Sequence, residues 1–465
     1  MNINEAIDKQ KIGSFQAIVV ILGFFIIMAD GLDVVIMGFI APQLREEWGV
    51  SPQMLGVLFS AALLAQVFGA AISGPLADRF GRKVVVLSSL AWFGGGTAAA
   101  AFATDATTLI LLRFIAGLGL GAALPNTITL VSEYVPRRAQ SFLVNVATCG
   151  FTVGAACGGL VAAWIIPAFG WRGVLVFGGV FPLLVALGSI IWLPESIGFL
   201  LARNGDQARA RRLVQRLGID VPETTILTLL ASEKEAAGPV RTLLLPRYRF
   251  GSIMLWLSYF VVLFAVYLLS SWLPTLIKDG GGYTVSDAAI AAAMFQVGGP
   301  AGVLAIGWLM DRNSKTLVIG TALLAGAVMM IGVTQIETNF VMLCVAAALI
   351  GFCLNGSAVG MNALAAAFYP TTARATGVSW MTGFGRAGAT LSAIAGGLLL
   401  GWGWKADAVF SVLSIPVLVC VLAMLLFGRH ERRRTETPGL SVASGPADGD
   451  GLSSALATIN KERAR

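Results

Sequence analysis

Long apolar runs recur along the whole chain, and short polar segments separate them. Each run is about 20 residues long, enough for an α-helix to cross roughly 30 Å of hydrocarbon. Twelve membrane-spanning helices are predicted, near residues 17–41, 54–76, 84–103, 107–130, 142–164, 173–193, 250–276, 287–309, 316–334, 340–364, 376–400 and 406–428. The pattern therefore predicts an all-α, multi-pass membrane protein.

Composition supports this prediction. The chain has 465 residues, of which 57% are hydrophobic and 12% charged, and its mean hydropathy is +0.81. A soluble domain could not cover so much apolar surface with so few charges. The first run is too long for a cleavable signal peptide and carries two aspartates, so we expect it to stay as a span.

The basic residues are distributed unevenly. Of the 32 Lys and Arg residues, only Arg45, Arg172, Lys278 and Lys405 fall in the loops on one side, and Arg113 and Arg386 fall inside spans. All the others flank the opposite side, which the positive-inside rule makes cytoplasmic. Both termini are therefore predicted to be cytoplasmic, and the formal charge of +7 indicates topology rather than nucleic-acid binding.

Polar segments divide the chain. We expect a six-helix bundle at 1–193, a cytoplasmic linker at 194–249, a second six-helix bundle at 250–428 and a disordered cytoplasmic tail at 429–465. The linker contains a basic amphipathic segment at 199–217, which is predicted to lie as a helix on the membrane surface. The tail is rich in Gly, Ser, Thr, Pro and Ala, a composition typical of disorder.

The two halves of the sequence repeat each other. Gly74-Pro-Leu-Ala-Asp78-Arg79 returns 233 residues later as Gly307-Trp-Leu-Met-Asp311-Arg312, again after the second span of its half. Gly154-Ala returns as Gly388-Ala. Two related six-helix halves predict a substrate site at their interface, near the middle of the membrane.

Four charged residues inside spans break this repeat. Asp30, Asp33, Arg113 and Arg386 have as counterparts Leu263, Val266, an alanine and Thr152. Repeated residues are expected to be scaffold or gate, whereas residues that break the repeat are expected to carry the chemistry.

The two aspartates lie three residues apart, so on a helix they share one face. A carboxylate at bilayer depth is costly and is usually kept where it faces a partner or a water-filled pathway. Burial and a neighbouring like charge both favour a protonated carboxyl group. Since the single histidine, His430, lies outside the spans, we expect Asp30 and Asp33 to carry a proton. The alternative is a static salt bridge to Arg113 or another cation.

Longer motifs resemble a known family. The loop Gly74-Pro-Leu-Ala-Asp78-Arg79-Phe-Gly-Arg82-Lys83 is a complete copy of the signature of the major facilitator superfamily. Asp30-Gly31-Leu32-Asp33 resembles the motif of the aromatic acid:proton symporters in that superfamily. Arg113-Phe-Ile-Ala-Gly, Gly170-Trp-Arg, Leu193-Pro-Glu-Ser and Gly385-Arg-Ala-Gly agree with the same subfamily.

The resemblance implies a major facilitator fold with twelve transmembrane helices in two pseudo-symmetric halves. It also implies a gating clamp made of Asp78, Arg79, Arg82, Asp311 and Arg312 at the cytoplasmic ends of the spans. Glu133 is expected to close this clamp or to accept the outgoing proton. The fifth span lacks the Gly-Pro pair that marks antiporters of the superfamily, which favours symport.

The residues suggest how a substrate is bound. Arg386, near the middle of its span, is the first choice for a carboxylate because a guanidinium donates two parallel hydrogen bonds. Arg113 is the second choice, and both arginines could instead be fixed counter-ions. Tyr259 and Tyr267 could stack on an aromatic ring or anchor the helix in the interface. Gln296 and Asn355 could contact a ring hydroxyl or join helices.

Together these features predict a monomeric importer that takes up an aromatic carboxylate, such as a hydroxybenzoate, with a proton across a bacterial inner membrane by alternating access. Its other partner is the lipid bilayer. No metal, cofactor, nucleic acid or enzymatic activity is expected, since no metal-ligand or nucleophile–base constellation is present. The alternatives are a proton symporter of a non-aromatic organic anion and a membrane sensor that binds aromatic acids without moving them.

Overall fold

The computed structural model describes residues 3–10, 12–202, 206–219, 243–333, 339–369 and 373–436, and none of these residues forms a strand. The helices are α1 (Ile3–Lys9), α2 (Ser14–Trp48), α3 (Pro52–Phe80), α4 (Arg82–Ala100), α5 (Ala106–Tyr134), α6 (Arg137–Trp192), α7 (Ile197–Ala202), α8 (Gln207–Arg216), α10 (Pro246–Gly281), α11 (Val285–Arg312), α12 (Lys315–Val333), α13 (Phe340–Phe368), α14 (Arg374–Gly401) and α15 (Ala406–Glu436).

Eleven helices in the described part of the chain are long and apolar enough to cross a membrane. One of them, α6, has 56 residues, which at 1.5 Å per residue is about 84 Å, more than twice the hydrocarbon thickness. Its helical geometry breaks at Gly170, where φ is +66°, a value that glycine adopts without strain. Because α6 contains two of the predicted spans, the prediction of twelve transmembrane helices is confirmed.

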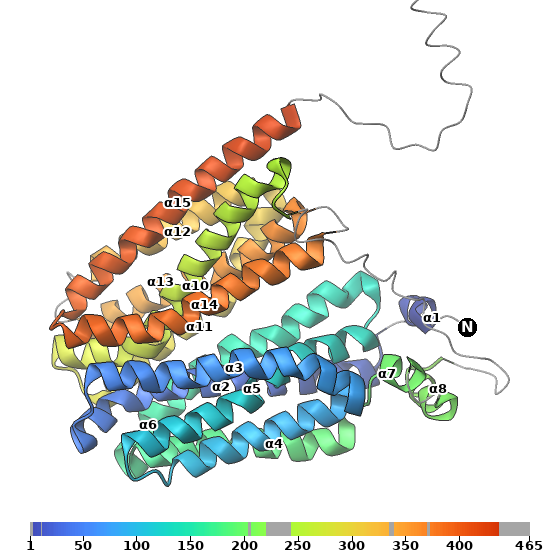
Figure 1. The fold of residues 1–465 in the computed structure, drawn as a ribbon, viewed down its shortest axis with the longest axis horizontal. Helices are drawn as coiled ribbons and strands as arrows, with labels where there is room; N and C mark the ends of the chain where they lie inside the picture. Colours follow the sequence, from blue (N-terminus) through green and yellow to red (C-terminus); the bar gives the residue numbers. More distant parts are fainter. Residues whose placement is uncertain are drawn as a thin grey trace, which may run out of the picture. The chain divides into compact units, whose positions relative to one another are not determined.

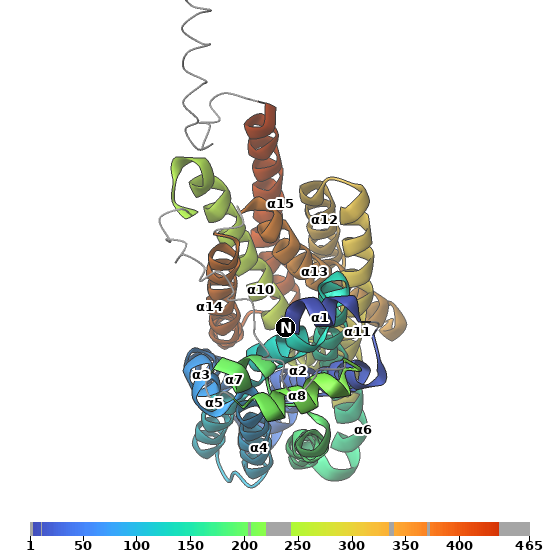
Figure 2. The ribbon, with the colours of Figure 1, turned by 90° about the vertical axis from the view of Figure 1, so that its right-hand side faces the viewer.

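The spans pack in two groups, and the packing repeats. In residues 14–192, α2 packs against α6 and α3 against α5; in residues 246–427, α10 packs against α14 and α11 against α13. Figures 1 and 2 show the helices of each group gathered together. Between the groups, α6 contacts α11, α3 contacts α14 and α2 contacts α10. The repeat seen in the sequence therefore appears as repeated helix pairs.

The repeated Gly-Ala pairs have a packing role. A Cβ atom on Gly154 of α6 would lie 2.0 Å from the carbonyl oxygen of Met28 on α2. A Cβ atom on Gly388 of α14 would lie 2.4 Å from the carbonyl oxygen of Phe260 on α10. Glycine at both positions allows two helix backbones to approach closely, and Met28 is two residues from Asp30.

The predicted amphipathic linker contains α7 and α8. Asp206 caps the N-terminus of α8, and its carboxylate accepts a hydrogen bond from the backbone N–H of Arg209 at 2.9 Å. Ala210 and Val214 are buried, whereas Arg209, Arg212 and Arg216 are exposed. The rest of the linker, residues 220–242, and the tail beyond Glu436 lie outside the described residues.

Residues Met1–Phe427 form one compact unit, and Gly428–Arg465 form a second, of which the end of α15 is described. The domain boundaries predicted from the sequence stay a prediction. Within the first unit, we call the end at which α2 leads into α3 the distal end. The opposite end, at which α3 turns into α4, is the proximal end.

Candidate functional site

A buried ion pair lies at the centre of the N-terminal group of helices. The guanidinium group of Arg113 on α5 donates from Nη1 to Asp33 Oδ1 at 2.9 Å and from Nη2 to Asp33 Oδ2 at 2.8 Å. Both side chains are 1% exposed. The hydroxyl group of Thr97 on α4 donates to Asp33 Oδ1 at 2.6 Å and accepts from Arg113 Nη1 at 3.1 Å. The Asp33 carboxylate is thus fully compensated by its neighbours.

Asp30, one helical turn earlier on α2, has a different environment. It is also 1% exposed, but its Oδ1 atom accepts a single, long hydrogen bond among the described residues, from Nε2 of Gln66 on α3 at 3.3 Å. Its other oxygen, Oδ2, is buried without a hydrogen-bond partner in the described part of the chain. The carboxyl group also interacts electrostatically with Asp33 and with Arg386.

The C-terminal group of helices contributes a cation and two phenols to the same region. Tyr267 on α10 interacts electrostatically with Asp30, Arg386 and Tyr259. The Tyr259 hydroxyl group accepts a hydrogen bond from Nδ2 of Asn362 at 3.1 Å. Asp30, Arg386 and the two tyrosines therefore come together although they belong to different halves of the chain, as the sequence predicted for a site at the interface.

The two predicted amide side chains differ in their bonding. Gln296, 3% exposed, donates from Nε2 to the hydroxyl group of Ser270 at 2.9 Å. Asn355, 9% exposed, has a buried Nδ2 atom without a partner among the described residues. A Cβ atom added to Gly299 would lie 3.4 Å from this Nδ2 atom and 3.3 Å from the methyl group of Thr152, so Asn355 faces α6 of the other half.

This arrangement follows the internal repeat. Thr152 is the counterpart of Arg386, and Gly299 is the counterpart of Gln66. Arg386 acts electrostatically on Asp30, which bonds to Gln66, whereas Thr152 lies beside Gly299 and Asn355. The interface therefore has a charged region and a neutral polar region related by the pseudo-symmetry of the chain.

The residues of the predicted clamp lie at the proximal end. Arg82 forms an ion pair with Glu133, whose other carboxylate oxygen accepts a hydrogen bond from the Ser196 hydroxyl group at 2.7 Å. The guanidinium group of Arg79 lies 5.3 Å from the ring centroid of Phe80, and that of Arg312 lies 3.8 Å from the ring centroid of Trp308. The side chain of Asp311 is exposed to solvent. Asp78 is not without an interaction partner.

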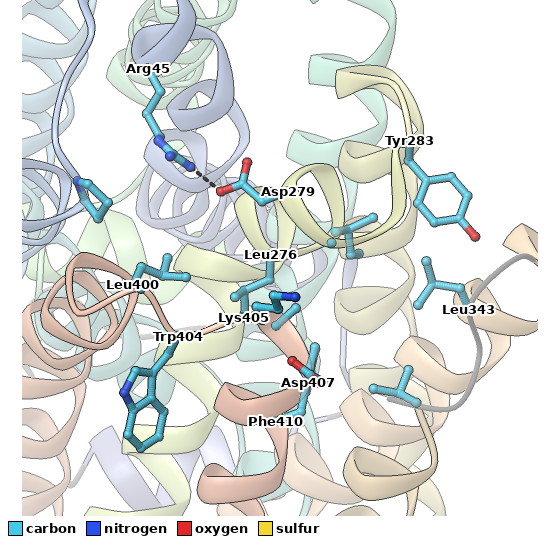
Figure 3. Close-up of a pocket in the computed structure, with 16 residues that line it drawn as sticks. Arg45, Leu276, Asp279, Tyr283, Leu343, Leu400, Trp404, Lys405, Asp407 and Phe410 are labelled. Atoms are coloured by element: carbon cyan, nitrogen blue, oxygen red, sulfur yellow. Dashed lines mark hydrogen bonds and ion pairs between the residues drawn. The ribbon is translucent and has the colours of Figure 1, made fainter.

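Two ion pairs that the sequence did not suggest join the halves at the distal end. Arg45 of α2 pairs with Asp279 of α10, as Figure 3 shows, and Glu46 pairs with Lys278 at 3.2 Å. Arg45 and Asp279 are separated by 234 residues, so they occupy pseudo-equivalent positions. They line a cavity of about 710 Å³ that also contains Trp404 and Lys405.

Sequence reasoning also missed Thr97 and Gln66, the polar partners of the two aspartates. Both are uncharged polar residues inside predicted spans, and their position inside the membrane was the one signal in the sequence that could have identified them as partners of a buried charge. Among the described residues, no group of three or more His, Cys, Asp or Glu side chains could hold a metal ion.

Comparison with known proteins agrees with this fold. The model of the Major Facilitator Superfamily matches residues 19–312 and 255–456. The computed structure is similar to the crystal structure of a D-xylose-proton symporter, with a TM-score of 0.70 and 14% identity, covering 89% of this chain and 98% of that chain. It is also similar to the inward open conformation of the xylose transporter XylE from E. coli, with a TM-score of 0.67 and 14% identity, covering 88% and 95%.

Similar curated proteins extend over nearly the whole chain. The 4-hydroxybenzoate transporter PcaK of Pseudomonas putida is 44% identical, covering 92% of this chain and 96% of the relative. The gallate transporter of Pseudomonas putida is 39% identical, covering 94% and 97%. The gentisate transporter of Corynebacterium glutamicum is 29% identical, covering 93% and 92%. The chain therefore belongs to the major facilitator superfamily and is a membrane transport protein rather than an enzyme.

Proposed function

We propose that this protein imports an aromatic carboxylate, such as a hydroxybenzoate, together with a proton across a bacterial inner membrane. Relatives named as transporters of 4-hydroxybenzoate, gallate and gentisate support the substrate class. Proton coupling is supported above all by one observation. Asp30 has a buried oxygen without a hydrogen-bond partner among the described residues, while Asp33, one helical turn away, is paired with Arg113.

Charge balance explains why a proton and an anion would move together. Asp33 and Arg113 neutralise each other, and Asp30 with Arg386 forms a second set of opposite charges. An organic anion bound beside Arg386 would add an uncompensated negative charge to a buried region, at a cost of several kcal/mol as an order of magnitude. Protonation of Asp30 removes that charge. Each ligand then favours binding of the other, which is thermodynamic coupling.

Arg386 is the proposed ligand of the substrate carboxylate. Its guanidinium group can donate two parallel hydrogen bonds to a carboxylate, and among the described residues no ion pair engages it. Arg113 was the second candidate, but its Nη1 and Nη2 atoms are engaged by Asp33. We therefore assign Arg113 the role of a fixed partner of Asp33, while Asp30 takes up the proton.

Tyr259 and Tyr267 are proposed to flank the aromatic ring. Both lie on α10 and interact electrostatically with Arg386, so a ring next to this arginine would contact them. Aromatic side chains provide a large apolar surface and a polar hydroxyl group at one edge. In this proposal Gln296, which is bonded to Ser270, shapes the wall of the site.

Asn355 is proposed to contact a polar ring substituent. Its Nδ2 group has no partner in the described structure, and a buried donor left unpaired costs about 1–3 kcal/mol. A ring hydroxyl oxygen would satisfy it. With the carboxylate at Arg386, the substrate would extend from the charged region of the interface toward the neutral one.

Alternating access would use the two ends of the bundle. We propose that the proximal end is cytoplasmic, because most basic residues lie there, and that Arg45–Asp279 and Glu46–Lys278 hold the distal end closed in this state. The clamp residues Asp78, Arg79, Arg82, Asp311 and Arg312, with Glu133, would close the proximal end in the opposite state. A single chain contains the whole proposed pathway.

Uptake by proteoliposomes tests the proposal. Purified protein is reconstituted, a pH gradient (acidic outside) is imposed, and accumulation of labelled 4-hydroxybenzoate is followed. The wild type is expected to accumulate substrate only with the gradient, and Asp30→Asn is expected to lose about 100-fold of this accumulation, the scale of about 2.7 kcal/mol. Binding without accumulation by the wild type would indicate a sensor, and accumulation of aliphatic acids alone would indicate a non-aromatic substrate.

Asp105→Asn provides a matched control. Asp105 is the N-cap of α5, outside the spans, and asparagine caps a helix as well as aspartate does. The hydrogen bond from the Thr108 hydroxyl group lowers the pKa of Asp105 below its ordinary value, so this carboxylate stays ionised between about pH 6 and 8. Its replacement is expected to leave proton-driven uptake unchanged.

A further inference from the structure

A second cavity, of about 680 Å³, lies at the proximal end between the α3–α4 turn, the end of α6 and helix α8. Its lining carries the basic residues Arg79, Lys83, Arg209, Arg212 and Arg216 and the single acidic residue Glu195. The excess of positive charge makes it a site for an anion.

The carboxylate of Glu195 already accepts hydrogen bonds from the backbone. Glu195 Oε1 accepts hydrogen bonds from the backbone N–H groups of Lys83 at 3.0 Å and Ser196 at 2.8 Å. None of the three α8 arginines forms an ion pair within the described part of the chain. Lys83 also interacts electrostatically with Arg209 and Arg216. Five basic side chains are therefore gathered around one carboxylate, that of Glu195, in this part of the described structure.

The fold of α8 directs these charges to one side. Arg209, Arg212 and Arg216 are spaced at i, i+3 and i+7, so they share a helix face. Ala210 and Val214 are buried on another face and attach the helix to the protein. The arrangement presents three guanidinium groups to the cavity, and guanidinium groups bind phosphate well because of their planar, forked geometry.

The remaining wall of the cavity is apolar and exposed. Phe80 is 51% exposed, Val84 49%, Ile191 74% and Trp192 58%, and all four line the cavity. They lie at the ends of membrane spans, where tryptophan typically marks the boundary between hydrocarbon and head groups. A basic rim beside exposed apolar side chains matches a molecule with an anionic head and hydrocarbon chains.

We propose that this cavity binds an anionic phospholipid, with its phosphate group between Lys83 and the arginines of α8 and its acyl chains along Ile191 and Trp192. Basic pockets at the cytoplasmic ends of spans are suited to such head groups. A free phosphate ion would satisfy the basic rim but leave the apolar wall uncovered. The site is separate from the proposed substrate site and is tested without any transported substrate.

Native mass spectrometry of the purified full-length protein tests this proposal. Palmitoyl-oleoyl phosphatidylglycerol and palmitoyl-oleoyl phosphatidylcholine are compared as ligands. Two variants, R209Q/R212Q in α8 and R247Q/R249Q at the start of α10, remove equal charge from exposed arginines. At about 1 kcal/mol per arginine near a membrane surface, R209Q/R212Q is expected to weaken phosphatidylglycerol binding by about 10- to 30-fold. R247Q/R249Q is expected to keep wild-type binding.

Equal loss in both variants would overturn the proposal, because it would indicate general surface charge. Equal binding of the two lipids by the wild type would also overturn it. A third arm adds inorganic phosphate to the lipid-loaded protein. Displacement of phosphatidylglycerol by phosphate at about 1 mM would indicate a soluble-anion site instead, since the acyl chains would then contribute little to binding.

Discussion

Asp30 and Asp33 lie one turn apart on α2 and are equally buried, but their surroundings differ. The Asp33 carboxylate receives two hydrogen bonds from Arg113 and one from Thr97. The Asp30 carboxylate receives one from Gln66, and its second oxygen has no partner in the described part of the chain. The two carboxylates therefore differ in their number of partners and not in their burial. The proposal that Asp30 carries the proton depends on this difference.

The same contrast separates the two places related by the internal repeat. Around Asp30, Gln66 and Arg386 the interface is charged, and around Thr152, Gly299 and Asn355 it is polar but neutral. In the proposal above, the carboxylate of the substrate lies in the charged region and its ring hydroxyl group in the neutral one. The predictions below test the contrast from its largest expected effect to its smallest.

Removing one partner of the compensated pair should be the most damaging change. Arg113→Met leaves the Asp33 carboxylate buried without its cation, and losing one partner of a buried ion pair costs about 3–5 kcal/mol. Thermal unfolding followed by tryptophan fluorescence in detergent should show a clear loss of stability. The double variant R113M/D33N removes both charges and should recover part of it. Full stability of Arg113→Met alone would show that the pair is not needed.

Replacing Arg386, the proposed ligand of the substrate carboxylate, by lysine should have a smaller effect. Arg386→Lys keeps the positive charge but loses the planar fork, which is worth one charge-assisted hydrogen bond, or about 1.5–3 kcal/mol. The binding constant for 4-hydroxybenzoate, measured by isothermal titration calorimetry, should weaken by about 10- to 100-fold. Lys405→Arg, at an exposed distal position, is the control. Unchanged affinity of Arg386→Lys would exclude a bidentate contact.

Replacing Asn355 in the neutral region should change the preference between substrates more than the affinity for all of them. Asn355→Ala should weaken binding of 4-hydroxybenzoate by about 5- to 10-fold, the value of one neutral hydrogen bond. Benzoate, which lacks the hydroxyl group, should bind as well as before. Asn126→Ala is a matched control, because the side chain of Asn126 bonds to the backbone of its own helix. Equal losses for both ligands would mean that Asn355 only packs.

The smallest effect is expected from the distal ion pairs. Arg45 and Asp279 are partly exposed, and such pairs contribute about 0.2–1 kcal/mol. D279N should therefore shift the distal end toward opening by less than about 5-fold, and higher salt should reduce the effect. The fluorescence of a probe attached to a cysteine introduced at the distal end measures the opening. A shift of more than 100-fold would mean that these pairs hold the closed state almost alone.

The sequence predicted the fold because its signals were long and repeated. Apolar runs identified the spans, and the return of the Gly74–Arg79 motif at Gly307–Arg312 identified the two halves. The i, i+3 spacing placed Asp30 and Asp33 on one wall. The spacing could not show whether Asp30 or Asp33 pairs with Arg113, because that depends on how α5 and α4 pack against α2.

Other contacts carried no strong local signal. Gln66 and Thr97 are ordinary polar residues until the folded chain brings them beside the aspartates. Arg45, Glu46, Lys278 and Asp279 resemble solvated loop charges, since their pairing requires the two halves to meet at the distal end.

Proton uptake on substrate binding tests the central claim most directly. The purified protein is placed in weakly buffered solution near pH 7, and a pH indicator follows the addition of 4-hydroxybenzoate. The wild type should take up about one proton per bound anion, and Asp30→Asn should take up almost none while still binding. Substrate binding by the wild type without any change in bound protons would contradict the account.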